Sequence, residues 1–302
     1  MTQAESKRSW WPWKRMKNQV PARPGAGPET TPSATISEPV MAAATKPTPS
    51  RSSQAVARVR ADLIRPHTPG GDPNAQAALC EGMPTGRAEQ HRVHISARTQ
   101  FFDQQVLAAL DRGVRQVVIL GAGYDDRALR FRVPGVRYFE LDHPDTQADK
   151  RLRLQRMGAD TEGLVLAAAD FRHVKAADVL ADNGHDPNQA SVFICEGLLV
   201  YLDQPATIDL LGGLRSRADA DSRLLASLAV HAEGIDSQVV AQRANEARRN
   251  AVNEPWRTIL PAAGQRDLLA RAGWVVAESF DDADFEREAR RGRTMLAVAR
   301  PD

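Results

Sequence analysis

The chain has 302 residues, enough for one large domain or two small ones. Hydrophobic residues make up 42% of the chain and charged residues 26%, so a packed core is available. The 40 basic and 38 acidic side chains nearly balance, which argues against a nucleic-acid binder, and two cysteines cannot form a disulfide framework. No stretch reaches the roughly 20 apolar residues that span a bilayer. We therefore expect a globular protein of the reducing cytoplasm.

The start of the chain differs in composition from the rest. Residues 1–50 carry seven basic against three acidic side chains, and eight of the 19 prolines. Such a Pro/Ser/Thr/Ala-rich tract cannot bury enough apolar surface to fold. We therefore predict a disordered tail at residues 1–51 and one domain at residues 52–302. Trp10, Trp11 and Trp13 lie among basic side chains, which favours either weak contact with an anionic membrane surface or a solvated tail.

From residue 52 onward helix and strand patterns alternate, which is typical of an α/β domain with a mainly parallel sheet. A helix is expected to end near residues 111–112, before Gly113. Apolar runs predict strands at residues 116–120, 137–141, 164–168, 191–194, 224–230, 274–278 and 294–299. Helices are predicted at residues 144–156, 205–218 and 265–272, with Asp203 as the N-cap of the second. A polar insertion occupies residues 233–254.

Each of the first four predicted strands ends in glycines or an acidic residue. The first runs into Gly121 and Gly123, where a ligand can approach the backbone closely. The next three end at or near Asp142, Asp170 and Glu196. Doubly wound sheets bind ligands at the carboxyl ends of their strands, so we expect a nucleoside-type site there. Asp142 follows Gly121 by 21 residues, the spacing at which an acid meets ribose hydroxyls.

The glycine pattern does not match a dinucleotide fingerprint. Asp126 stands where that fingerprint has its third small residue, and a carboxylate there would repel a pyrophosphate. A ligand with a sulfonium and no phosphate tolerates acidic neighbours, so S-adenosylmethionine is the predicted cofactor. The alternatives are a nicotinamide-dependent oxidoreductase and a non-catalytic module that binds membrane or RNA through the basic Trp-rich arm. No metal site is predicted, because His91 and His94 lack a convincing third ligand.

Four segments of the sequence carry a linked pattern: ARTQFFD at residues 97–103, QVVILGAGYDDR at 116–127, FELDHP at 139–144 and EGLLVYL at 196–202. Together they resemble the leucine carboxyl methyltransferase family, above all its bacterial branch of S-adenosylmethionine-dependent methyltransferases. The resemblance covers roughly residues 52–302. It implies a doubly wound, mostly parallel seven-stranded methyltransferase sheet, with a terminal antiparallel hairpin and an N-terminal helical cap.

The resemblance also implies roles for single residues. Arg98 would grip the carboxylate of the methionine moiety, and Glu196 would face the same end of the cofactor. Phe171, whose backbone would help to frame the adenine, stands where the family usually has leucine. The predicted cofactor-binding residues are Arg98, Gly121, Gly123, Asp142, Asp170, Phe171 and Glu196.

The strand ends carry no clear histidine or lysine base. A carboxylate acceptor is already ionised at neutral pH and needs no such base, whereas an amine or phenol usually does. The sequence therefore favours O-methylation of a carboxylate, in a peptide C-terminus or a small-molecule acid. Arg127 and Tyr201 are the candidates for orienting that acceptor. The alternatives are a structural ion pair for Arg127 and a packed lid for Tyr201.

Overall fold

The computed structural model describes residues 48–84, 92–247, 254–277 and 294–302. Most of the predicted tail, including the three tryptophans, lies outside these residues, as does His91. His94 is described, and its Nε2 atom lies 3.2 Å from the hydroxyl of Thr294.

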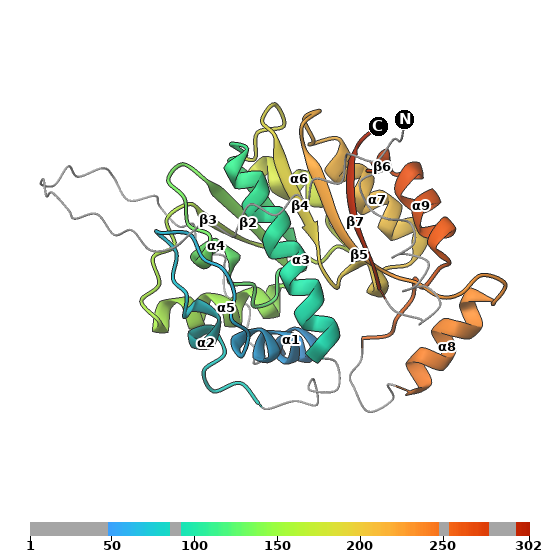
Figure 1. Cartoon of the computed structure of the whole chain (residues 1–302), viewed down its shortest axis with the longest axis horizontal. Coiled ribbons are helices and arrows are strands. Elements are labelled where there is room, and N and C mark those ends of the chain that lie inside the picture. Colours follow the sequence, from blue (N-terminus) through green and yellow to red (C-terminus); the bar gives the residue numbers. More distant parts are fainter. Residues whose placement is uncertain (1–47, 85–91, 248–253, 278–293) are drawn as a thin grey trace, which may run out of the picture. The chain divides into compact units, whose positions relative to one another are not determined.

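A seven-stranded sheet with the order β3-β2-β1-β4-β5-β7-β6 forms the centre of the domain (Figure 1). Neighbouring strands from β3 to β5 are parallel, whereas β7 is antiparallel to both β5 and β6. This confirms the predicted doubly wound sheet and its terminal hairpin. The strands are β1 (Gln116–Leu120), β2 (Arg137–Asp142), β3 (Leu164–Ala168), β4 (Ser191–Cys195), β5 (Arg223–Ala229), β6 (Trp274–Val276) and β7 (Thr294–Pro301).

Helices cover both faces of this sheet, and α3 crosses in front of it in Figure 1. Two short helices, α1 and α2, pack together, and α1 also packs against α3, so they form the predicted N-terminal cap. The helices are α1 (Arg51–Ala61), α2 (Ala75–Leu79), α3 (Arg92–Asp111), α4 (Arg127–Arg130), α5 (Pro144–Arg156), α6 (Ala176–Asp182), α7 (Gln204–Arg215), α8 (Ser237–Ala247) and α9 (Ala262–Arg271), with a 3-10 helix, η3, at Leu199–Tyr201.

The alternation of side chains along the central strands creates two separate cores. On β1, Val118 and Leu120 point to the face covered by α6, α7 and α9, whereas Val117 and Ile119 face α3 and α4. Strands buried on both faces are continuous apolar runs, which is why their positions could be predicted closely.

Local signals explain where several helices begin and end. Asp203 caps α7 as predicted, because its carboxylate accepts the N–H of Ala206 at 2.9 Å. Gly113 lies two residues after the end of α3, and its φ of +93° is in the left-handed region that commonly terminates a helix. The helix α7 stops at Arg215, three residues earlier than predicted. The helices α4, α6 and α8 were not predicted, since α4 and α6 are too short for a clear period and α8 lies in the polar insertion.

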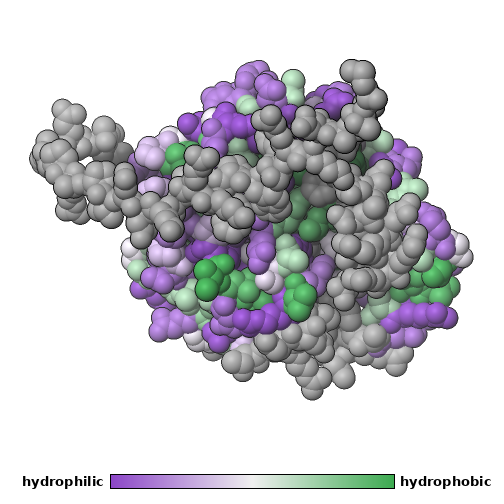
Figure 2. All heavy atoms as spheres, in the orientation of Figure 1, coloured by the Kyte–Doolittle hydropathy of each residue, from purple (hydrophilic) through white to green (hydrophobic). Residues whose placement is uncertain are grey.

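The described surface carries apolar side chains only in separate places. Among the coloured atoms in Figure 2, purple predominates and the green areas are small. The exposed large apolar side chains are Ile64, Val93, Leu152, Val174, Ile235 and Val239. In the described ranges, no helix combines the length and the hydropathy needed to cross a membrane.

The structure places the last residues of the predicted tail on the domain. Ser50 is the N-cap of α1, and its N–H donates to the hydroxyl of Thr146 at 3.2 Å. Its own hydroxyl donates to Glu254 at 2.9 Å, while the N–H of Thr48 donates to Asp145 at 3.2 Å. Residues 48–50 are therefore attached to the domain and α1 begins at Arg51, while the boundary between tail and domain stays a prediction.

Two truncations test this boundary. Removal of residues 1–47 should leave the melting temperature unchanged, because the composition of that segment offers no core. Removal of residues 1–53 should lower it by about 4–8 °C, since the cap of α1 and its hydrogen bonds are lost. Differential scanning calorimetry of the two truncated proteins measures both values. A large fall for the shorter deletion would contradict the predicted tail.

Candidate functional site

The loop after β1 brings the backbone close to the cap. Gly121 and Gly123 adopt φ values of +63° and +53°, in the left-handed region that favours glycine. A Cβ atom on Gly123 would lie 2.8 Å from the Cβ of Ser53, and one on Gly121 would lie 3.1 Å from Leu198. The backbone conformation therefore favours glycine at both positions, and at Gly123 a side chain would also clash with Ser53.

Asp142 lies at the end of β2, directly beside this loop. One carboxylate oxygen accepts the N–H of Gly123 at 2.5 Å and the other accepts the N–H of His143 at 2.6 Å. An ionised carboxylate has about four acceptor positions, so each oxygen can accept one more hydrogen bond. Burial raises the pKa of Asp142 above its ordinary value, against the effect of the two N–H groups.

Asp170 lies two residues after β3 and is paired with a residue that the sequence analysis did not single out. Arg172 binds it through Nε at 2.9 Å and through a terminal nitrogen at 2.6 Å, and these bonds lower the pKa of Asp170 to about 2. The Nε2 atoms of His143 and His173 each lie 3.9 Å from the same carboxylate. Phe171 is half-buried against the core beneath α6 and α7.

Glu196 follows β4 and is enclosed by arginine side chains. Its carboxylate forms ion pairs with Arg60 at 2.6 Å, Arg98 at 2.9 Å and Arg127 at 3.0 Å, and its side chain is 4% exposed. Burial alone would raise the pKa of Glu196, but the three guanidinium groups outweigh it and hold the pKa well below its usual value. Glu196 is therefore ionised in the folded protein.

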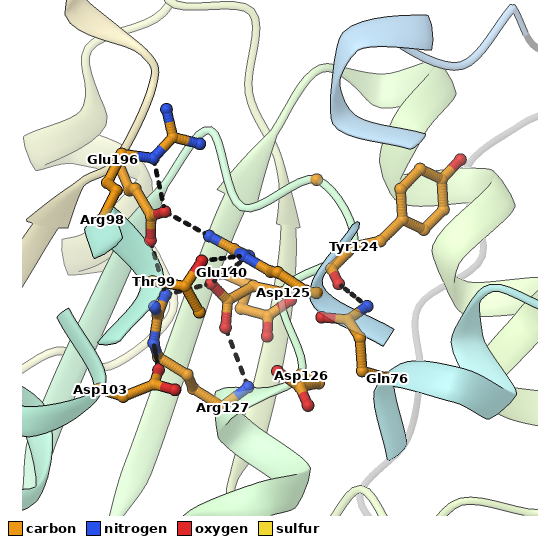
Figure 3. A network of polar contacts seen from close by, with 12 residues as sticks. Gln76, Arg98, Thr99, Asp103, Tyr124, Asp125, Asp126, Arg127, Glu140 and Glu196 are labelled. Atoms are coloured by element: carbon orange, nitrogen blue, oxygen red, sulfur yellow. Dashed lines mark hydrogen bonds and ion pairs between the residues drawn. The ribbon is translucent and has the colours of Figure 1, made fainter. Parts of the chain in front are cut away.

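These contacts belong to a larger buried cluster, which we call the arginine–carboxylate network (Figure 3). Arg65, just after α1, binds both oxygens of Asp103 at 2.8 and 3.0 Å and reaches Asp126 at 2.6 Å. The network joins α1, α3, the loop after β1 and the end of β4. Its members are Arg60, Arg65, Arg98, Arg127, Arg130, Asp103, Asp125, Asp126 and Glu196.

Asp126 does not act as the sequence analysis expected. Its carboxylate is fully buried between Arg65 and Arg130, at 2.6 and 2.7 Å, and so is neutralised within the network. Its charge would therefore not meet a pyrophosphate at the loop. The prediction that Asp126 would repel the pyrophosphate of a dinucleotide is therefore wrong.

Arg127 also lies inside the network. It binds Asp103 at 2.8 Å, Asp125 at 2.5 Å and Glu196 at 3.0 Å, and it has no exposed surface. A guanidinium so placed cannot reach an acceptor without breaking buried ion pairs. The geometry therefore favours the alternative interpretation of Arg127 as a structural ion pair.

Arg98 occupies the outer side of the network. Only its Nε is used by Glu196, and within the described part of the chain its two terminal nitrogens form no ion pair. In Figure 3 these nitrogens point away from Glu196. Tyr201, on η3, is half-buried and close enough to Arg98 for an electrostatic interaction. Its predicted contact with an acceptor stays a prediction.

A second buried ion pair, between Lys150 and Glu140, supports the loop after β1. Lys150, on α5, donates to the carbonyl of Asp125 at 2.7 Å and to the carboxylate of Glu140 on β2. Burial raises the pKa of Glu140 to about 7, although Lys150 opposes this. This pair could not be predicted from the sequence, because residues ten apart on a strand and a helix carry no local signal of contact.

Comparison with known proteins agrees with this architecture. The model of the family described as "leucine carboxyl methyltransferase" matches residues 53–215, more than half of the chain. The chain belongs to the leucine carboxyl methyltransferase family. The matched region includes the loop after β1, Asp142, Asp170 and Glu196, so the family pattern and the site coincide.

Relatives in this family come from actinobacteria. A protein of Streptomyces avermitilis is 37% identical over 80% of this chain and 87% of its own length. One from Frankia alni is 36% identical over 69% of this chain and 70% of its own. Each is named "Putative S-adenosyl-L-methionine-dependent methyltransferase", as is a Parafrankia protein that is matched over 64% of its length.

A solved structure shares the fold. It is titled as a "putative methyltransferase" from Thermobifida fusca, and it superposes with a TM-score of 0.52 over 80% of this chain and 97% of its own. The identity is 15%, so this similarity concerns the fold alone. It supports the predicted methyltransferase sheet independently of the family assignment.

The network predicts an unequal cost of removing acidic side chains. Asp103→Ala should destabilise the protein by about 3–5 kcal/mol, because it removes one carboxylate partner from each of two buried arginines, Arg65 and Arg127. Asp62→Ala is the matched control, since it removes an exposed pair with Arg92 and should cost about 0–1 kcal/mol. Urea unfolding measures both. Equal costs would show that the network does not hold the cap in place.

Proposed function

We propose that this chain transfers a methyl group from S-adenosylmethionine to a carboxylate oxygen. S-adenosylmethionine is the cofactor given in the names of the chain's relatives. The observation that carries the proposal lies at one edge of the sheet. There, among the described residues, Asp142 keeps acceptor positions and the terminal nitrogens of Arg98 form no ion pair, as binding of that cofactor needs. When bound, the cofactor supplies a methyl group activated by a sulfonium.

Asp142 has the chemistry to hold a ribose. Its two oxygens are oriented by the N–H groups of Gly123 and His143, and each has one acceptor position left for a hydroxyl. These features fit a nucleoside diol beside the loop.

The charge of the network fits a ligand carboxylate. Five arginines face four carboxylates, which leaves one positive charge in the cluster. Arg98, the arginine with unused terminal nitrogens, is 12% exposed and thus the member best placed to meet a ligand. A planar guanidinium binds a carboxylate through two parallel hydrogen bonds, as the methionine end of the cofactor requires.

The predicted adenine site needs one qualification. The carboxylate of Asp170 is already engaged by Arg172, so an adenine amino group would share it with that arginine. The side chain of Arg172 is 70% exposed, and its contacts within the described ranges are with Asp170, so it can shift at little cost. We infer that Asp170 and Phe171 border the adenine and that Arg172 lies beside them.

The positions of three described histidines agree with a carboxylate acceptor, which needs no general base. His143 and His173 lie by Asp170, on the β2–β3 side of the sheet and away from Glu196. His231, just after β5, is buried and uses both ring nitrogens, at 2.8 Å from the carbonyl of Ala232 and 2.8 Å from Ser237. None of these three histidines is placed as a free base beside Glu196, and Tyr201 stays our candidate for orienting the acceptor.

The other functions considered from the sequence are not favoured. A nicotinamide-dependent oxidoreductase would stand against the family match, although the charge of Asp126 no longer argues against it. We propose a peptide or small-molecule acid as the acceptor and no nucleic-acid partner. Contact of the basic Trp-rich segment with an anionic membrane surface remains a proposal from composition alone.

Substitution of Asp142 tests the ribose contact. Asp142→Asn should weaken binding of S-adenosylhomocysteine at least about tenfold, because charge-assisted hydrogen bonds contribute about 1.5–3 kcal/mol each. Wild-type affinity should also fall on acidification, since the ionised form binds and burial has raised its pKa. Isothermal titration calorimetry across pH measures both effects. Asp160→Asn, at an exposed ion pair, is the control, and an unchanged affinity for Asp142→Asn would exclude the ribose role.

The chemistry of the product tests the acceptor class. Protein incubated with methyl-tritiated S-adenosylmethionine and a cell extract should yield a methyl ester, which mild alkali hydrolyses to volatile methanol. Methylated amines, phenol ethers and carbon-linked methyl groups survive that treatment. Counts that stay in the non-volatile fraction would contradict carboxyl methylation while leaving methyl transfer itself in place.

A further inference from the structure

The turn that follows β4 touches three parts of the site at once. Glu196 enters the arginine–carboxylate network, and the side chain of Leu198 lies against Gly121. Between them, Gly197 has a φ of +72°, and a Cβ atom on it would lie 3.5 Å from a terminal nitrogen of Arg98. The position of this one turn therefore sets the relation between the loop after β1, Glu196 and Arg98.

A serine of the neighbouring strand holds the turn. The N–H of Gly197 donates to the hydroxyl of Ser227 at 2.7 Å. Ser227 lies on β5, and the register that pairs Cys195 with Ala226 brings it beside the turn. It is 4% exposed, so water does not readily replace this bond.

We propose that Ser227 is a positioning residue for methyl transfer, which fixes the turn after β4 and through it the side chains of Glu196 and Arg98. The inference rests on the proposed function, because it assigns those two residues to the methionine end of the cofactor. No role for Ser227 follows from the four sequence segments that resemble the family.

Glycine makes the turn dependent on this bond. Glycine can adopt more backbone conformations than any other residue type, so the φ of +72° at Gly197 is not maintained by the residue's own sterics. Without the hydroxyl, the part-buried N–H of Gly197 would lose this partner, and the backbone would be free to shift. Methyl transfer requires the reacting atoms at attack distance, so a shift of even 1 Å is costly in rate.

The chain contains a matched control at the other end of the same strand. Ser222 is also buried, and its hydroxyl accepts the N–H of Ser191 at 3.0 Å, where β4 begins. Removal of either hydroxyl leaves one strand-end N–H of β4 without its acceptor. Only Ser227, however, lies at the carboxyl end of the sheet, next to Glu196.

The experiment compares two ligands and four variants of the full chain. S-adenosylhomocysteine carries the methionine end, whereas 5′-methylthioadenosine lacks it. Ser227→Ala should weaken S-adenosylhomocysteine binding about 3- to 10-fold, the value of one hydrogen bond, and leave methylthioadenosine binding unchanged. Ser222→Ala should change neither affinity, although both variants should lower the melting temperature to a similar extent.

A second pair of variants answers the case in which Ser227→Ala does not fold. Ser227→Thr keeps the hydroxyl and should bind S-adenosylhomocysteine as the wild type does, whereas the similarly sized Ser227→Val should not. Equal affinities of the threonine and valine variants, or an equal loss for both ligands, would overturn the positioning role. Wild-type protein that binds neither ligand would instead overturn the proposed function, and this inference with it.

Discussion

The buried pairing of arginines with carboxylates is the interaction on which the rest of the site depends. Arg60 and Arg65 come from the cap, Asp103 from α3, Asp125 from the loop after β1 and Glu196 from the end of β4. No one of these segments could keep its charge in the protein interior alone, because an unpaired buried ion costs several kcal/mol. Each segment is therefore held in the one arrangement in which all the carboxylates are neutralised.

Much of the fold could be predicted because its signals are local. The central strands are continuous apolar runs such as residues 116–120, α7 begins after the capping residue Asp203, and α5 begins with proline, Pro144. The candidate site was predicted in part for the same reason. Asp142 and Glu196 follow such strands, and parallel pairing of β2, β1 and β4 brings them to one edge.

What could not be predicted depends on contacts between distant residues. Arg127 follows a glycine-rich loop and so resembles a ligand-binding residue, but its partners Asp103 and Glu196 lie 24 and 69 positions away. The same holds for Ser50, whose composition places it in the tail and whose hydrogen bonds to Thr146 and Glu254 place it in the domain. Composition cannot show such pairings, since they form only when the sheet has brought the segments together.

The way in which α1 is attached also determines how the protein responds to temperature. Two small apolar clusters lie beneath the cap, whereas the sheet is packed between two large apolar cores; the small clusters are Ala57, Cys80, Met83 and Tyr124, and Ala75, Leu79, Leu129 and Leu154. On heating, hydrophobic stabilisation per unit of buried area levels off, whereas the desolvation penalty of ion pairs falls. The cap and the sheet are thus held by forces of different temperature dependence. As temperature rises, the ion pairs that attach the cap contribute more to stability relative to the apolar cores that hold the sheet.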